Sequence, residues 1–307
     1  MTFRTGVVSA TFGVLIAGAG AAEAQELANA PEAPVTCTIA ERSNFLPEAV
    51  RETSGLARGL HTPNTFWTHN DSGNGAEIYA LDATGEVLRS VKVRGVKPVD
   101  WEDIESGPCD DGHCLYIADI GDNDRARSTI HLYRIPEPAA SVGEVSPTTI
   151  TMRYEDGPQD AESVFVLPSR EIFIVTKGRH AGIALYRLDA PAGSESGTLV
   201  KVRDLFPQPS DENDRVTAAT SSPDGEWVAI RTYRHLYLYP AQALVTNQSV
   251  TPVTLDLSPL AQIQGESVAI TTDGSIWLTS EAEDKRAMPT WSKLSCRFPA
   301  TPVSPGS

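Results

Sequence analysis

Residues 160–178, "DAESVFVLPSREIFIVTKG", and residues 265–283, "GESVAITTDGSIWLTSEAE", carry the same pattern. Each copy begins with Glu-Ser-Val, runs on as an apolar strand, turns, and continues as a second apolar strand. The spacing from Glu162 to Phe173 equals the spacing from Glu266 to Trp277. A strand pair that recurs within one chain indicates a repeat architecture in which each copy forms one structural unit.

Three further copies extend the pattern. Residues 216–234, "VTAATSSPDGEWVAIRTYR", keep it with Thr217 in place of the glutamate, and Ser-Pro-Asp-Gly in the middle is a strong turn signal. Residues 101–121, "WEDIESGPCDDGHCLYIADIG", and residues 53–73, "TSGLARGLHTPNTFWTHNDSG", are looser copies with longer turns. Each copy is followed by a third short strand, such as "IALYRLD" or "HLYLYP", and all but the last by a fourth.

Four antiparallel strands repeated around a circle form a β-propeller. The last copy lacks a fourth strand of its own, and "PVTCTIAE" at residues 34–41 can supply it from the other end of the chain. The sequence therefore predicts an all-β fold: a single β-propeller domain over residues 35–298, with five blades, or six as the alternative, and a ring closed by the N-terminal strand.

The N-terminus has the features of a secretory signal. One early arginine is followed by an apolar run from Gly6 to Ala19 and by the small-residue pattern Ala22-Glu23-Ala24. That run is too short to span a membrane, and no later stretch is longer or more apolar. We expect a signal peptide at 1–24, a flexible segment at 25–34, a loose tail at 299–307, and a soluble monomer that is periplasmic or secreted.

The cysteines Cys37, Cys109, Cys114 and Cys296 are even in number, which in an exported protein favours disulfides. Cys109 and Cys114 flank a short turn, and this leaves Cys37 and Cys296 to join the two ends of the domain. A zinc site is the alternative, but Cys37 and Cys296 lack a neighbouring histidine or second cysteine.

The formal net charge of −15 disfavours a nucleic-acid partner. Several explanations of the negative charge remain open: a bound cation, a cationic ligand, a small anionic ligand held through a cation, or simple solubility.

In a propeller, the start of each first strand and the end of each second strand open into one central funnel. The alignment of the copies gives the first-strand positions as Ser54, Glu102, Glu162, Thr217 and Glu266. It gives the second-strand ends as Asp71, Asp119, Lys177, Arg231 or Thr232, and Glu281. Carboxylates in this number cannot share a funnel unpaired, so we expect bases or a bound cation among them.

The run from Asp119 to Asp124 has the alternating oxygen ligands and the glycine of a calcium loop, and this adds Asp122 to the predicted Ca²⁺ ligands. Turn acids of this kind also cap loops by accepting bonds from backbone amides, and repeated glutamates can bond neighbouring blades. His69, in "WTHND", is the one histidine predicted near the funnel, as a base or a substrate-binding group.

The motifs "DAESV", "GESVAI" and "DGSIWLTSE" resemble those of exported bacterial propellers of the calcium-dependent phytase type and of the related esterase-like phytases. The likeness covers most of residues 50–285 as short pieces, and that family has six blades. It implies that Glu162, Glu266 and Glu281 face a metal and that Lys177 contacts a phosphate.

Three functions follow as hypotheses. The first is a metal-assisted hydrolase of an anionic ester, with a phosphoester favoured: Glu102, Glu162 and Glu266 act in catalysis, Asp71, Asp119, Asp122, Glu162, Glu266 and Glu281 hold Ca²⁺, and His69, Lys177 and Arg231 bind the substrate. The second is a propeller that binds a ligand or partner without catalysis. The third is a glycosidase with a pair of the funnel glutamates as acid and base.

Overall fold

The computed structural model describes Met1 and residues 35–62, 64–110, 112–190, 193–246, 248–282 and 287–299. The chain divides into Met1–Pro34 and Val35–Ser307, and the fold described below is that of the second unit. Apart from Met1, the predicted signal peptide and the segment 25–34 lie outside the described residues, as does the predicted tail beyond Pro299.

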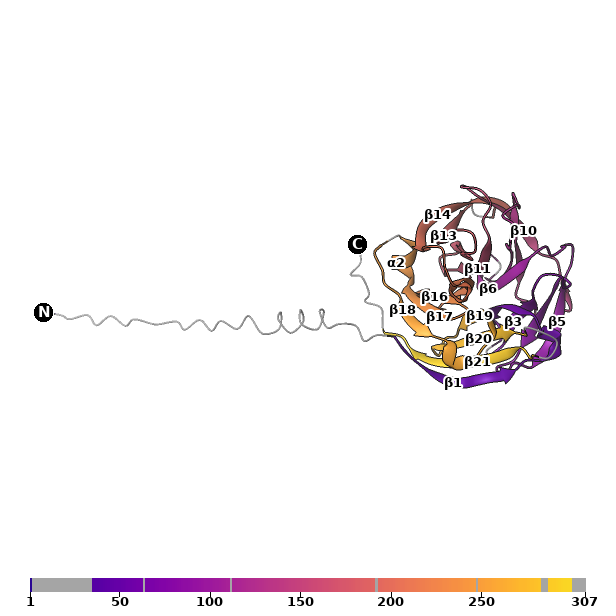
Figure 1. The fold of residues 1–307 in the computed structure, drawn as a ribbon, viewed down its shortest axis with the longest axis horizontal. Helices are drawn as coiled ribbons and strands as arrows, with labels where there is room; N and C mark the ends of the chain where they lie inside the picture. The colour runs from indigo at the N-terminus through magenta and orange to yellow at the C-terminus, as the bar shows by residue number, and fades with distance from the viewer. Residues whose placement is uncertain are drawn as a thin grey trace. The chain divides into compact units, whose positions relative to one another are not determined.

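Almost every element of this unit is a β-strand, and successive strands pair antiparallel in meanders (Figure 1). The first meander consists of β2 (Thr53–Arg58), β3 (Phe66–Asn70), β4 (Glu77–Leu81) and β5 (Val87–Val93). The second consists of β6 (Trp101–Cys109), β7 (Gly112–Asp119), β8 (Ile130–Pro136) and β10 (Thr148–Tyr154). The third consists of β11 (Ala161–Val166), β12 (Ile172–Thr176), β13 (Ile183–Asp189) and β14 (Ser196–Phe206).

The remaining strands make two more meanders in the described part of the chain. One consists of β15 (Val216–Ser221), β16 (Trp227–Thr232), β17 (His235–Pro240) and β18 (Val253–Asp256). The other consists of β19 (Gln264–Ile270), β20 (Ser275–Glu281), β21 (Thr290–Arg297) and, from the N-terminal end, β1 (Thr36–Phe45). The helical elements are short, namely η1 (Glu48–Val50), η2 (Glu212–Asp214), α2 (Ala241–Val245) and η3 (Ser258–Leu260).

The first strands of the meanders lie side by side around a common centre. β2 contacts β6, β6 contacts β11, β11 contacts β15, β15 contacts β19, and β19 returns to β2. The ring is therefore closed, and the predicted all-β propeller is confirmed. No described helix is long and apolar enough to cross a membrane.

The outer edges carry pairings that the repeat pattern did not predict. β9 (Glu144–Val145) lies parallel to β5, and β10 lies parallel to β14. The second pairing joins two meanders into one eight-stranded sheet. An exposed strand edge is open to pairing with another chain, so these contacts cover edges that would otherwise be free.

The apolar core lies in layers between neighbouring meanders. One layer packs Phe66 of β3 against Trp277 of β20 and Trp291 of β21, with ring centroids 5.3 and 5.1 Å from that of Phe66. Edge-to-face and tilted packing of this kind stabilises aromatic pairs beyond the area that they bury. The alternating apolar residues of the repeats are thus used for packing between meanders.

The closing strand β1 pairs antiparallel with β21, with Cys37 opposite Cys296 and Phe45 opposite Thr290. The two cysteines form a disulfide, as the sequence predicted. Hydrogen bonds and a covalent bond thus join the two ends of the chain within one sheet.

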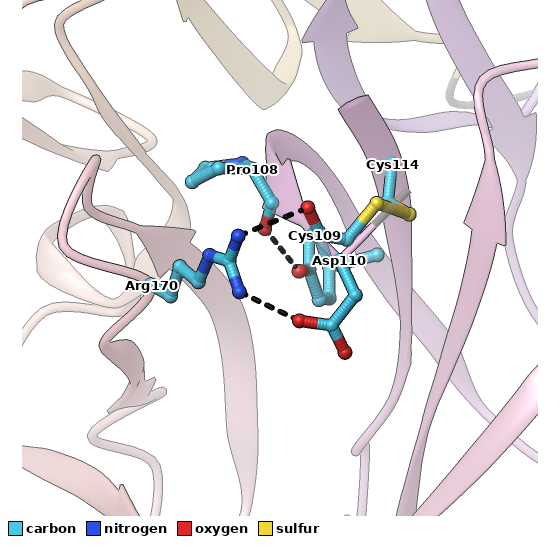
Figure 2. Close-up of a disulfide and its surroundings, with 6 residues drawn as sticks. Pro108, Cys109, Asp110, Cys114 and Arg170 are labelled. Atoms are coloured by element: carbon cyan, nitrogen blue, oxygen red, sulfur yellow. Dashed lines mark hydrogen bonds and ion pairs between the residues drawn. A yellow bond between two sulfur atoms is a disulfide. The ribbon is translucent and has the colours of Figure 1, made fainter. Parts of the chain in front are cut away.

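The second disulfide, Cys109–Cys114, closes the β6–β7 hairpin. Figure 2 shows Arg170 reaching this hairpin, where its guanidinium donates to the Asp110 carboxylate at 2.6 Å and to the Cys109 carbonyl at 3.3 Å. The neighbouring meander therefore holds the hairpin by polar contacts as well.

We predict that the two disulfides differ in their effect on stability. In the chain-entropy model, a cross-link between residues 259 apart contributes on the order of 5 kcal/mol, whereas a link over a separation of 5 contributes about 2 kcal/mol. The double variant Cys37→Ser/Cys296→Ser should therefore lower the Tm more than Cys109→Ser/Cys114→Ser. Scanning calorimetry of both variants checks this, and an equal or reversed order would contradict it.

Candidate functional site

In four of the described meanders, the start of the first strand carries a β-bulge at the same position of the repeat. The pairing with the second strand skips Glu102 in β6, Glu162 in β11, Thr217 in β15 and Glu266 in β19. A bulge leaves the extra residue out of the ladder and re-aims its side chain. The recurring glutamates of the sequence are therefore bulge residues, released from regular pairing at one end of the ring.

The first meander departs from this rule. In β2 the register shift falls between Ser54 and Ala57, and Ser54 stays paired with His69. The Ser54 hydroxyl donates to the Glu102 carbonyl at 2.7 Å. Ser54 thus supports the strand that carries Glu102.

The register also identifies the ends of the second strands. The residue after each bulge faces Ala118, Val175, Arg231 or Thr279, and Ser54 faces His69. Two residues beyond these partners, the equivalent positions are Asp71, Ile120, Lys177, Tyr233 and Glu281. The sequence alignment had placed Asp119 and Arg231 or Thr232 there, so the structure moves these positions to Ile120 and Tyr233. The same register makes Ser54 equivalent to the residues that follow the bulges, so the first-strand position predicted at Ser54 moves to Thr53.

The charged side chains at these two kinds of position gather with Tyr233 and Asp100 into one group, which we call the acidic centre. Its members are Asp71, Asp100, Glu102, Glu162, Glu266 and Glu281, together with Lys177 and Tyr233. Glu102, Glu162, Glu266 and Lys177 are buried. Carboxylates therefore outnumber the cation Lys177, and the charge is held where water screens it poorly.

Lys177 bonds directly to Glu162, and both side chains are buried. Burial alone would lower the pKa of Lys177, but the nearby charges of Glu162 and Glu102 raise it. Lys177 is therefore a fixed positive charge within the acidic centre.

Three carboxylates of the centre converge closely enough to share one ion. An oxygen from each of Asp71, Asp100 and Glu102 lies within 4.8 Å of the other two. Gly121 makes room for them, because a Cβ at that position would lie 2.1 Å from Glu102 Oε1 and 2.4 Å from Asp100 Oδ2. An all-oxygen set of this kind fits a hard divalent cation such as Ca²⁺.

Without a cation, the crowding favours protonated acids. Burial, followed by the charge of Glu162, raises the pKa of Glu102 well above its usual range. Burial, together with Glu266 and Asp71, raises the pKa of Glu281 to about 9. Burial, followed by the charge of Asp71, also raises the pKa of Asp100.

Two residues that the sequence predicted as metal ligands, Asp119 and Asp122, instead accept hydrogen bonds from protein groups. Asp119 is fully buried and accepts from the amides of Val99 and Asp100, each at 3.1 Å, and from Arg127 at 2.8 Å. Asp122 accepts from two amides of its own turn, each at 2.8 Å. These acids hold the 119–127 turn, which was the alternative explanation for them.

Two predicted substrate-binding residues lie away from solvent. Arg231 is fully buried and donates to the carbonyls of Ser267 at 2.6 Å and Thr279 at 2.8 Å. His69 is also fully buried, in edge-on contact with Trp101 at 5.5 Å, and burial lowers its pKa. Both side chains contribute to packing in these positions.

Asp100 and Tyr233 are the members of the acidic centre that the sequence reasoning missed. Asp100 precedes β6 and stands two residues before Glu102, as Asp160 stands two residues before Glu162, so the Asp-x-Glu start that these two copies share was a signal that could have identified it. Tyr233 follows the end of β16 and is equivalent to Lys177 and Glu281. Counting two residues beyond Arg231 in the copy at 216–234 would have found it.

No family model and no curated protein matches this chain. Among solved structures, it is similar to the PQQ-bound aldose sugar dehydrogenase of Streptomyces coelicolor, with a TM-score of 0.52 and 13% identity over 87% of this chain and 100% of that one. It also matches the calcium-binding protein regucalcin of Agrobacterium tumefaciens, with a TM-score of 0.48 and 14% identity over 85% and 96%. A third match is Sqt1 of Chaetomium thermophilum, bound to the N-terminus of ribosomal protein L10, with a TM-score of 0.37 and 16% identity over 81% and 65%.

The first of these likenesses supports the class of fold, a β-propeller, and at this identity it supports nothing finer. The resemblance to calcium-dependent phytases stays a prediction from the sequence motifs.

We predict that Gly121→Ala weakens cation binding. The added methyl group must displace the Glu102 and Asp100 carboxylates, and disturbed support of ligands typically costs 10- to 100-fold in metal affinity. Gly143→Ala is the matched control, because a Cβ there meets nothing within 4 Å. Titration calorimetry with Ca²⁺ measures both, and equal affinities in the two variants would contradict the assignment.

We also predict that, without divalent cations, stability falls between pH 7 and pH 9. The folded state keeps protons on Glu102 and Glu281 that the unfolded chain releases near pH 4.5, so raising the pH through the folded pKa favours unfolding. The Tm should be lower at pH 9 than at pH 7 in chelator, and Glu281→Gln should reduce the difference. A Tm that rises over this range would count against buried protonated acids.

Proposed function

We propose that the acidic centre is a divalent-cation site, with Ca²⁺ favoured, at which the protein hydrolyses an anionic ester, with a phosphoester favoured. The observation that carries this proposal is the convergence of Asp71, Asp100 and Glu102 within 4.8 Å. Three such oxygens close together repel one another unless a cation or protons lie between them.

The donor set favours calcium over the softer metals. Asp71, Asp100 and Glu102 offer only carboxylate oxygens, whereas zinc and copper sites in proteins use histidine and cysteine. Ca²⁺ takes six to eight oxygens in flexible geometry, so water and substrate oxygens would complete the shell. Glu162 and Glu266 lie in the same group and are available as further acids.

The residues suit an anionic substrate in the presence of the cation. A bound Ca²⁺ would polarise the ester and lower the pKa of a water molecule beside it. Lys177 supplies a second positive charge, and Glu162 holds its ammonium group in place. Glu102 and Asp100 stay ionised while they hold a cation, because the nearby positive charge opposes the effect of burial on their pKa.

Binding without catalysis is the second candidate, and the basic side chains favour it. Arg231 donates to backbone carbonyls, and Lys177 is paired with Glu162. Both of these described side chains are therefore held by protein groups and would have to leave their partners to bond the ester as it reacts. On this alternative the cation holds a ligand at the ring centre.

We predict that hydrolysis of simple phosphomonoesters requires Ca²⁺, is lost in chelator, and falls at least about 100-fold in Glu102→Gln. Gln keeps the shape of the side chain and removes the ligand charge. The exposed Glu86→Gln is the matched control and should keep full activity.

Two outcomes separate the candidates. Tight Ca²⁺ binding by the wild type without turnover of any ester would leave the binding function. The absence of Ca²⁺ binding by calorimetry would contradict both.

A further inference from the structure

A second feature lies beside the acidic centre, on the meander that closes the ring. A cavity of about 370 Å³ is lined by Phe45, Ile263, Met288, Ser280, Glu281 and Thr290, among others. We call it the rim pocket. Glu281 belongs both to this pocket and to the acidic centre, where the charges of Asp71 and Glu266 act on it.

The rim pocket gathers exposed apolar side chains from three separate segments. Phe45 ends β1 and is 69% exposed, Ile263 lies between η3 and β19 and is 62% exposed, and Met288 precedes β21 and is 40% exposed. Single exposed apolar residues need no explanation, but several that line one cavity mark an interaction site.

Phe45 and Ile263 are exposed although apolar residues close to them in the sequence are buried. Leu46, next to Phe45, is buried at 1% exposure, and Leu260, shortly before Ile263, is buried at 2%. The chain at these points therefore places one apolar side chain in the core and its neighbour in the pocket. Pairing of Phe45 with Thr290 across β1 and β21 holds the aromatic residue at the rim.

The dimensions fit part of a small molecule. Ligand pockets are typically about 300 to 1,000 Å³ and combine apolar walls with a few polar groups. Here the walls are Phe45, Ile263 and Met288, and the polar lining includes Thr290 and Glu281, of which Glu281 also belongs to the acidic centre.

We propose that the rim pocket binds the apolar leaving group of the ester that is hydrolysed at the acidic centre, so that the preferred substrates are aryl and branched-alkyl phosphomonoesters. This inference rests on the proposed function. In the reaction one water is consumed, its oxygen forms the new bond to phosphorus, the bond from phosphorus to the leaving oxygen breaks, and that oxygen takes up a proton. The apolar alcohol then leaves from the pocket and phosphate from the centre.

The test compares two inert ligands with the same charged group. Phenylphosphonate and methylphosphonate are titrated calorimetrically into the full protein with Ca²⁺, and phenyl phosphate and methyl phosphate are assayed for hydrolysis. We expect the wild type to bind phenylphosphonate about tenfold more tightly than methylphosphonate, because only the phenyl ring buries a large apolar surface in the pocket.

Phe45→Ser and Ile263→Ser should bring that ratio close to one and leave the affinity for methylphosphonate unchanged. Leu88→Ser is the matched control, because Leu88 is 56% exposed, close to Ile263 at 62%, and lies on β5, outside the pocket. An unchanged ratio in both pocket variants would overturn the proposal.

The remaining outcomes are distinguishable. Preference for phenylphosphonate without hydrolysis of phenyl phosphate would overturn the proposed reaction, and with it the leaving-group role, and would leave a binding subsite. Hydrolysis of both esters with no preference would overturn the rim pocket alone, and no binding of either phosphonate would overturn both. Conversion of a dimer to a monomer by Phe45→Ser, seen by analytical ultracentrifugation with an unchanged ligand ratio, would make the pocket an interface between copies and overturn its role in substrate binding.

Discussion

The pairing of β1 with β21 is the constraint on which the rest of the structure depends. The first strands can surround a common centre only if the last meander is complete and packs against the first. Its fourth strand comes from the other end of the sequence, and Cys37–Cys296 holds it covalently. Closing so long a loop costs conformational entropy, which the cross-link removes from the unfolded chain.

Ring closure brings together side chains that repel one another. Three different meanders supply Glu102, Glu162 and Glu266. These glutamates come close together because the first strands that carry them all surround the same centre. Burial of this charge is unfavourable, and the protein offsets it in part with the Glu162–Lys177 pair and with protons on other acids. This concentration of buried charge at one place supports our proposal that the acidic centre is the functional site.

The bulges connect the repeat to the chemistry. A regular ladder would direct successive side chains to alternate faces of each sheet, into the apolar layers between meanders. The extra residue at Glu102, Glu162 and Glu266 interrupts this alternation at the end of the ring where the second strands also finish. The same backbone irregularity therefore separates the acids from the core and brings them to one site.

The sequence by itself determined the propeller, the closing strand and both cysteine pairs. These depend on local patterns, namely alternation, turns and the recurrence of Glu-Ser-Val, which one chain displays directly. It also determined that Glu102, Glu162, Glu266 and Lys177 share one end of the ring, because equivalent positions in a repeat occupy equivalent places.

Only the tertiary structure decided how each of these side chains is used. Asp119 and Arg231 are charged residues at nearly the predicted positions, yet register differences of one and two residues direct them to backbone amides and carbonyls. Asp100 joins Asp71 and Glu102, and Gly121 leaves room for the Asp100 and Glu102 carboxylates. Contacts of this kind depend on strand register and on distances through space, and the spacing of residues along the chain carries no information about those distances.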